Sequence, residues 1–367
     1  CREVMTAYLA RIHALNPRLN AIVNLAPDAA LLAQADACDA ELAQGRSRGW
    51  LHGIPQAIKD TGHALGFPST VGCSLLKDVM PTQDSVMTAR MKAAGCIVIG
   101  KTNMPELGLG SHTFNDLFGA TPNAWDSSVT AGGSSGGAAV ALAQRLLPVA
   151  DGSDFMGSLR NPAAWNHIFG MRPSQGRVPL WPAADTFVAQ LGTEGPMART
   201  VTDLARLLST QAGREARAPL SIAQGPQDFA VGEGTAALKG LRVGWLGDLQ
   251  GYLPMEGGLL PVCEQALARM AQSATSEPQK LRYALRLGQC AYLDKNFEQA
   301  VGHLKTVVES RQAAEDPALR EALFLMGDCL LQLNKPEEAA KVLDRYCKLS
   351  KTPRDEALYK LAAAQAR

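Results

Sequence analysis

Charge is the first thing that this sequence has little of. Its 367 residues include 36 Lys and Arg and 35 Asp and Glu, so the formal net charge is +1 and charged residues make up only 19%. A soluble domain ordinarily has about a quarter of its residues charged. With almost no net charge, the chain lacks the field that gathers nucleic acid or an anionic lipid surface. We therefore expect no nucleic-acid partner, and any ligand must be held by a defined site.

Long hydrophobic runs are missing as well. Hydrophobic residues make up 46% of the chain, yet no stretch of about 18 consecutive uncharged apolar residues occurs. This pattern excludes a membrane-spanning helix and a membrane partner, and the hydrophobic share excludes a disordered chain. The 367 residues exceed the roughly 150 of an average domain, so we expect one sizeable core and a second unit.

Cysteine motifs are absent although cysteine itself is not. The eight cysteines include no C-x-x-C pair and no histidine at the spacing of a metal site. We expect reduced, mostly buried thiols in a cytoplasmic protein, with neither a metal nor a cofactor.

Charge, glycine and proline divide the chain near residue 272. Residues 273–367 hold 28 charged residues in 95, whereas residues 1–272 hold 43. Three of the 34 glycines and four of the 21 prolines lie in the later segment. The first segment is therefore predicted to be rich in loops and the second to be rich in helices.

The first segment alternates between helical and strand-like patterns. Apolar residues at helical spacing predict a helix over Arg2–Leu15, which Asn16-Pro17 should end. The alternation predicts an α/β layer with a largely parallel, covered sheet, in which sites form at strand ends. The further predicted elements are helices over Pro27–Ala43 and Asp84–Ala94 and buried strands over Ile54–Ile58 and Cys96–Ile99.

Three polar stretches interrupt these patterns. In the first, GIPQAIKD (53–60), Lys59 ends an apolar run that is typical of a strand. A lysine at a strand end is commonly just a surface residue. In a low-dielectric interior, however, its amine loses its charge readily and becomes a competent general base.

The second stretch, AGGSSGG (131–137), leads into an apolar helix predicted over Ala138–Leu147. Its glycines let the backbone adopt unusual conformations and place Ser134 and Ser135 at a helix N-terminus. A phosphate-binding loop is disfavoured because the P-loop and dinucleotide spacings are missing. The stretch also fits G-x-S-x-G around Ser135, the nucleophile elbow of α/β-hydrolases, whose later histidine would have to be His167 or His303.

The third stretch, DGSDFMGSLRNP (151–162), follows the apolar run Leu146–Ala150 and puts Ser158 on a loop past a strand end. Consecutive backbone N–H groups before a serine can stabilise an oxyanion. Asp154 and Arg160 are able to pair and hold the loop. Taken alone, a polar turn with a local ion pair would be the simpler interpretation.

Together and in this order, the three stretches resemble the amidase signature family of serine amidohydrolases. The resemblance implies a mixed α/β sheet that is largely covered and flanked by helices. It covers residues 2–270, because similar motifs continue along the chain: NPRLNAIVN (16–24), GKTNMPELGLGSHTFND (100–116), GMRPSQGRVP (170–179) and GPMART (195–200).

The family uses a serine, a second serine after a cis peptide bond, and a lysine. By motif position, the resemblance implies Ser158 as nucleophile, Ser134 as proton relay and Lys59 as base. A serine hydroxyl is a weak nucleophile at neutral pH, and a neutral lysine can activate it through the second serine without a histidine. Ser135 is expected to support the site with a hydrogen bond.

The oxyanion formed on an amide carbonyl would be stabilised by a run of backbone N–H groups, those of Phe155, Met156, Gly157 and Ser158. Met156 departs from the family pattern, in which many members have glycine. A side chain there hinders positive φ and adds bulk beside the oxyanion. We expect it to narrow the pocket or to mark a subgroup.

The second segment is predicted to be a helical-repeat array. Leu287-Gly288 recurs as Met326-Gly327 after 39 residues, and Ala300 recurs as Ala339. A third start is at Leu358. Small residues where helices cross, at a period of this size, resemble tetratricopeptide repeats, which bind peptides or partner proteins on a concave face. Plain amphipathic hairpins are the alternative.

We therefore predict a truncated amidase signature domain over residues 1–271, a linker over 272–279 and incomplete repeats over 280–367. A strand over 241–246 and a helix over 259–270 would end the first domain. The predicted function is hydrolysis of a small-molecule carboxamide to a carboxylate plus ammonia or amine, through an acyl-enzyme. The alternatives are a non-catalytic scaffold whose repeats bind a partner protein, and a glutamine-hydrolysing amidotransferase subunit.

Overall fold

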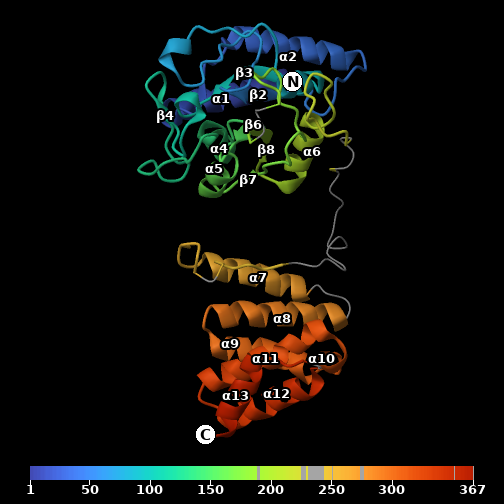
Figure 1. Ribbon diagram of the computed structural model, residues 1–367. Helices are drawn as coiled ribbons and strands as arrows, with labels where there is room; N and C mark the ends of the chain where they lie inside the picture. The colour runs from blue at the N-terminus through green and yellow to red at the C-terminus, as the bar shows by residue number, and fades with distance from the viewer. Residues whose placement is uncertain are drawn as a thin grey trace. The chain divides into compact units, whose positions relative to one another are not determined.

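The computed structural model describes residues 1–187, 191–224, 229, 244–249, 251–272, 277–350 and 352–366. The chain forms two compact units, Cys1–Val231 and Gly232–Arg367 (Figure 1). Helices and strands build the first unit, and helices are the regular elements described in the second. No helix in these described ranges is long and apolar enough to cross a bilayer.

The first unit contains two three-stranded sheets, a short hairpin and the helices around them. Its helices are α1 (Arg2–Leu19), α2 (Asp28–Ala43), α3 (Val86–Ala93), α4 (Gly136–Ala143), α5 (Arg160–Trp165) and α6 (Val201–Gln211), with 3-10 turns at Ser74–Leu76 and Glu106–Gly108. Its strands are β1 (Ile22–Val23), β2 (Pro55–Lys59), β3 (Ile97–Thr102), β4 (Phe114–Asn115), β5 (Gly119–Ala120), β6 (Val149–Asp154), β7 (Phe169–Gly170) and β8 (Thr193–Ala198).

The sheets are mixed, as the family resemblance implies. The strand orders are β1-β3-β2 and β6-β8-β7. Among the strands described, β2 and β3 form the one parallel pair, and the other pairs are antiparallel. The expectation of a largely parallel sheet is therefore wrong. A helical crossover through α3 permits the parallel pairing of β2 and β3, whereas most other pairings follow connections that bring the chain back in the opposite direction.

Helix α1 runs through Pro17 and does not end at Asn16-Pro17 as predicted. A proline near the end of a helix removes only one backbone hydrogen bond, so the last turn survives. The helix ends at Leu19, and the next residue, Asn20, caps it with a φ of 47° and an N–H that donates to the Asn16 carbonyl oxygen. The Asn16 side chain then accepts from the N–H groups of Ala21 and Ile22, which directs the chain into β1.

Helix α4 is central to the core of the first unit. Every residue from Gly136 to Leu142 is buried, so this helix is apolar on all sides. It contacts β3, β6 and β8, while α1 and α2 pack against each other and join the same hydrophobic cluster (Figure 1). A Cβ on Gly137 would lie 2.4 Å from the backbone nitrogen of Asn103, so only glycine allows this close approach.

The second unit confirms the predicted helical repeat. In one hairpin a Cβ on Gly288 would lie 2.5 Å from Leu304, and in the next a Cβ on Gly327 would lie 2.5 Å from Leu343. The same small-to-large contact thus recurs after 39 residues. The helices are α7 (Leu259–Gln272), α8 (Glu277–Leu293), α9 (Phe297–Glu309), α10 (Gln312–Glu315), α11 (Pro317–Gln332), α12 (Pro336–Leu349) and α13 (Asp355–Gln365).

Two predicted features fall partly outside the described residues. Of the strand expected over 241–246, residues 241–243 lie outside them, and residues 244–246 are not in a strand. Of the linker expected over 272–279, residues 273–276 lie outside them, while α7 ends at Gln272 and α8 begins at Glu277. The helix expected over 259–270 forms as α7. All eight cysteines are free thiols. Most are buried, as expected, two are partly buried, and Cys263 is exposed.

Candidate active site

The Lys59 amine lies at the centre of a group of serine hydroxyls. Lys59 is the last residue of β2, and only 1% of it is exposed. Its Nζ donates to the Oγ of Ser134 at 2.7 Å and to those of Ser135 and Ser153 at 2.9 Å each. The direct hydrogen-bond partners of this buried amine are therefore neutral oxygens.

The backbone brings the AGGSSGG stretch to this amine. The peptide bond between Gly133 and Ser134 is cis, as the family resemblance implies. Ser135 directly precedes α4, and its Oγ donates to the carbonyl oxygen of Ser153 at 3.2 Å. Its backbone N–H donates to the carbonyl oxygen of Ser158 at 3.2 Å. The three polar stretches, which are far apart in the sequence, thus meet at one place.

Burial dominates the electrostatics of this place. It lowers the pKa of Lys59 from 10.5 to about 7, although the charges of Asp151, Asp154 and Glu194 oppose the shift. Near neutral pH a large share of the amine is therefore uncharged. An uncharged amine in hydrogen-bond contact with the Ser134 hydroxyl is able to accept that hydroxyl's proton.

Asp154, the last residue of β6, holds the loop that carries Ser158. Its carboxylate accepts from the N–H groups of Gly157 and Leu159 at 2.8 and 3.1 Å. It also pairs with the Arg160 guanidinium at 3.0 and 3.1 Å, so the predicted ion pair is present. Burial opposes ionisation of Asp154, but the accepted hydrogen bonds, first that from Arg160, lower its pKa overall.

The predicted oxyanion hole has one donor fewer than expected. The Gly157 N–H points at Asp154 and donates to its carboxylate, so it is not free to stabilise an oxyanion. No acceptor within the described ranges takes the N–H groups of Phe155, Met156 or Ser158. These three groups are the donors that the loop leaves available.

Met156 adds no bulk to an enclosed site. Its side chain is 81% exposed, and it is not the loop residue with a positive φ. That residue is Gly157, with a φ of 118°, and a Cβ there would lie 2.8 Å from the side chain of Asn161. The loop therefore needs glycine at Gly157 and tolerates a side chain at Met156.

Three polar residues of this cluster were not predicted as site residues: Asp151 and Ser153 on β6, and Glu194 on β8. The sequence predicts that Asp151 and Ser153 lie on a loop. Strand β6 instead extends to Asp154, because the Asp151 carboxylate and the Ser153 hydroxyl accept hydrogen bonds from Lys59 on β2. Their spacing of two residues was a usable signal, since it puts both on one face of a strand. Glu194 carried no such signal, because only the pairing of β6 with β8 sets it opposite Ser153.

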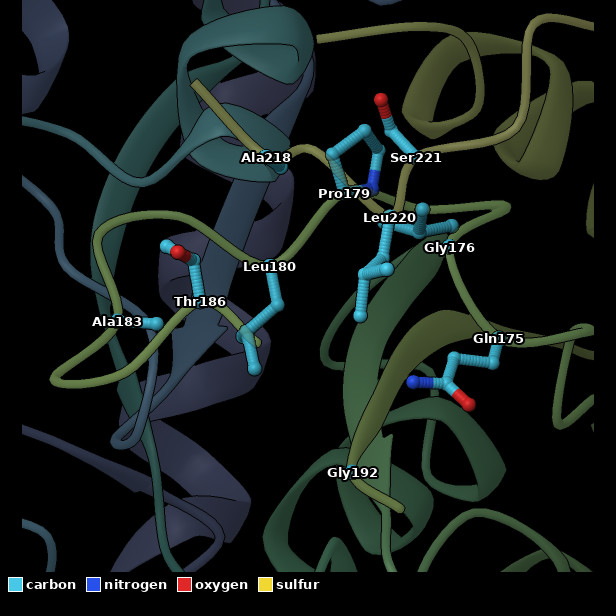
Figure 2. A pocket seen from close by; sticks show the side chains of 11 residues that line it. Gln175, Gly176, Pro179, Leu180, Ala183, Thr186, Gly192, Ala218, Leu220 and Ser221 are labelled. Carbon is cyan, nitrogen blue, oxygen red and sulfur yellow. The ribbon is translucent and has the colours of Figure 1, made fainter. Parts of the chain in front are cut away.

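A small cavity lies elsewhere in the first unit, where Leu180 and Leu220 from two separate loops line the same space (Figure 2). Its volume is about 30 Å³, room for about one water molecule and too little for an acyl group. Gly192, just before β8, also lines it. In the parts of the chain that the structure describes, no group of three or more His, Cys, Asp or Glu is placed to hold a metal ion.

Two family models match consecutive parts of the chain. The Amidase model matches residues 3–319, and a tetratricopeptide repeat model matches residues 321–350. The amidase match therefore runs through α8 and α9 before the repeat match begins.

Curated proteins similar to this chain are named as a subunit of glutamyl-tRNA(Gln) amidotransferase. That of Acidothermus cellulolyticus is 40% identical over 249 residues, which is 68% of this chain and 49% of that protein. That of Burkholderia vietnamiensis is 40% identical over 251 residues, which is 66% of this chain and 50% of that protein. The chain thus spans about half the length of the curated relatives it matches.

Solved structures with a similar fold include two amidases. A bacterial aryl acylamidase of the amidase signature family has a TM-score of 0.64 and 26% identity, covering 90% of this chain and 74% of that one. A peptide amidase from Stenotrophomonas maltophilia has a TM-score of 0.62 and 28% identity, covering 88% of this chain and 74% of that one.

Proposed function

The chain belongs to the amidase family, and on this premise we propose that it hydrolyses the C–N bond of a carboxamide through an acyl-enzyme on Ser158. The observation that carries the proposal is the buried Lys59 amine, 2.7 Å from the Ser134 hydroxyl. Few structural roles require a lysine whose charge is removed by burial and whose partners are all neutral.

In the proposed reaction, Lys59 accepts a proton from Ser134 as Ser134 accepts one from Ser158. The Ser158 oxygen attacks the amide carbon, and the free N–H groups of Phe155, Met156 and Ser158 stabilise the oxyanion. Each such donor contributes about 3 kcal/mol to the stability of the transition state. Ser134 passes a proton to the leaving amine and regains one from Lys59, and the amine departs and leaves the acyl group on Ser158. Water then attacks the ester by the same relay and releases the carboxylate.

A fluorophosphonate probe, which reacts with activated serines, tests the proposal. The parent protein should be labelled on Ser158, and Ser158→Ala should remove the label. Ser128→Ala, in an exposed turn of the same unit, is the matched control and should be labelled like the parent. A folded parent that stays unlabelled would contradict the proposal and favour the non-catalytic scaffold.

Glutamine is the second candidate substrate, and the names of the curated relatives favour it. Ammonia release from L-glutamine should then exceed arylamine release from an aryl acylamide and ammonia release from a peptide amide, the two alternatives that the names of the solved structures suggest. Measuring all three with the parent and with Ser158→Ala assigns the substrate class. Turnover of the aryl or peptide amide alone would contradict the glutamine assignment.

For the second unit we propose a peptide- or protein-binding role, supported by the repeat match over residues 321–350. We keep the boundaries inferred from the sequence, with an amidase segment over 1–271 and repeats over 280–367, as part of this proposal. A pull-down with residues 280–367 deleted from the full chain should lose the partner and keep fluorophosphonate labelling.

A further inference from the structure

Two carboxyl groups beside Lys59 take no part in the reaction proposed above. Asp151 is fully buried and Glu194 is 5% exposed. The Oδ2 of Asp151 accepts the backbone N–H of Lys59 at 3.0 Å. The Asp151 Oδ1 and the Glu194 Oε2 have no hydrogen-bond partner within the described residues. A buried carboxyl oxygen without a partner is costly, so it persists where a site needs it.

Strand pairing puts both carboxyl groups on the same side as the lysine. Asp151 and Ser153 are two residues apart on β6, so their side chains share one face of the sheet. Glu194 on β8 is the direct antiparallel partner of Ser153, and cross-strand partners have neighbouring side chains. Because Ser153 accepts a hydrogen bond from the Lys59 Nζ at 2.9 Å, Glu194 is one residue removed from the amine.

We propose that Glu194 and Asp151 are positioning residues for Lys59, a buried carboxyl pair whose own charge decides when the amine is free to accept a proton from Ser134. This inference rests on the proposed function of Ser158 and Lys59. It assigns a regulatory role in the reaction to two side chains that touch neither substrate nor nucleophile.

The charge states of the pair support this role. Burial first, and then the charge of Asp151, raise the pKa of Glu194 to about 8, against the opposing charge of Lys59. Burial also raises the pKa of Asp151 to about 6, against the hydrogen bond from Lys59 N–H and the charges of Lys101 and Lys59. Near pH 7, Glu194 therefore holds its proton and adds no charge beside the amine.

Other charged groups near Lys59 do not remove the electrostatic interaction between Lys59 and Glu194. Asp154 on β6 also favours the charged amine, but its carboxylate is held by Arg160. Lys101 on β3 acts on Asp151 and lies 3.7 Å from Asp60. Lys59 and Glu194 consequently lose their protons over overlapping pH ranges, as a coupled pair with two apparent steps. Ionisation of Glu194 draws a proton onto Lys59, so the free base is complete only after both steps.

The pH dependence of the fluorophosphonate labelling rate between pH 5.5 and 9.5 tests this coupling on the full chain. In the parent the rate should rise over a broad range between about pH 7 and about pH 8. Glu194→Gln keeps the size and removes the charge, so the rise should become that of one proton, with a midpoint lower by about one pH unit. Asp151→Asn should shift the midpoint in the same direction. Glu106→Gln, an exposed carboxyl in the same unit, should leave it unchanged.

The outcomes separate the two proposals. A parent that is not labelled at any pH contradicts the proposed function itself. Labelling of the parent with midpoints for Glu194→Gln and Asp151→Asn equal to that of Glu106→Gln overturns the inference, because a merely structural role changes the maximal rate and not the midpoint. Circular dichroism reports folding, and if Glu194→Gln is unfolded, Asp151→Asn decides by the same rule.

Discussion

Lys59 in the first unit and Lys360 in the second unit have opposite electrostatic surroundings. In the second unit, Asp328 is 3% exposed and forms an ion pair with Lys360 at 2.7 Å. Partial burial opposes the charge of Lys360, but its hydrogen bonds to Asp328 and Glu356 raise its pKa overall. In the first unit, Lys59 has only hydroxyl and carbonyl oxygens as direct partners, and burial lowers its pKa to about 7.

This difference distinguishes a structural lysine from a chemical one. Lys360 keeps its charge because it pairs with both Asp328 and Glu356, and its removal would leave the buried Asp328 carboxylate without a cation. A lysine surrounded by neutral hydroxyls loses its charge and becomes a base. We expect replacement of Lys59 to lower the reaction rate without lowering the free energy of unfolding. Replacement of Lys360 should lower the free energy of unfolding without lowering the reaction rate.

The largest expected effect follows from Lys59→Met. It removes the proposed base while keeping a similar volume, so the labelling rate at Ser158 and amide turnover at pH 7 should fall at least about 1,000-fold. The free energy of unfolding should not decrease, because the desolvation cost of the buried amine disappears. Activity within tenfold of the parent would rule out Lys59 as the base.

Gly157→Ala is expected to have the next largest effect. A side chain at a φ of 118° is strained, and its Cβ would lie 2.8 Å from Asn161, so the loop that carries the proposed oxyanion donors must move. Turnover should fall by about 100-fold, comparable to the loss of one oxyanion donor. Gly66→Ala is the matched control, since Gly66 has a φ of 90° with nothing within 4 Å of its Cβ. Equal losses in the two variants would show that backbone strain alone is responsible.

Lys360→Met makes the converse change in the second unit. It leaves the buried Asp328 carboxylate without its cation, which should lower the free energy of unfolding by about 2 kcal/mol. Denaturant unfolding followed by circular dichroism measures this change. The labelling rate at Ser158 should stay equal to that of the parent; a reduced rate would show that the two lysines do not have separate roles.

Met156→Gly is expected to have the smallest effect. The exposed side chain adds no bulk to an enclosed pocket and the N–H donor remains, so turnover of a small amide should change by less than about threefold. A rate increase above tenfold would mean that the side chain restricts the substrate after all.

Much of the site could be predicted from the sequence because its parts are local. The glycines beside Ser134 and Ser135, the apolar run that ends at Lys59, and the Asp154–Arg160 pair are each recognisable within a window of a few residues. The length of β6 and the end of α1 could not be predicted in this way. Strand β6 extends past the predicted loop start because Asp151 and Ser153 form hydrogen bonds with the distant Lys59. Helix α1 extends past Asn16 because its last turn tolerates Pro17.

The family resemblance, the catalytic candidates and the 39-residue repeat follow from the sequence, since they depend on residue types at fixed spacings along one chain. Which N–H groups of the loop remain free and which carboxyl groups lie near Lys59 depend instead on how the chain folds. Asp154 takes the Gly157 donor, and the pairing of β6 with β8 brings Glu194 to Ser153. These contacts join residues through burial and strand register, and burial, more than residue type, sets the charge of the lysine.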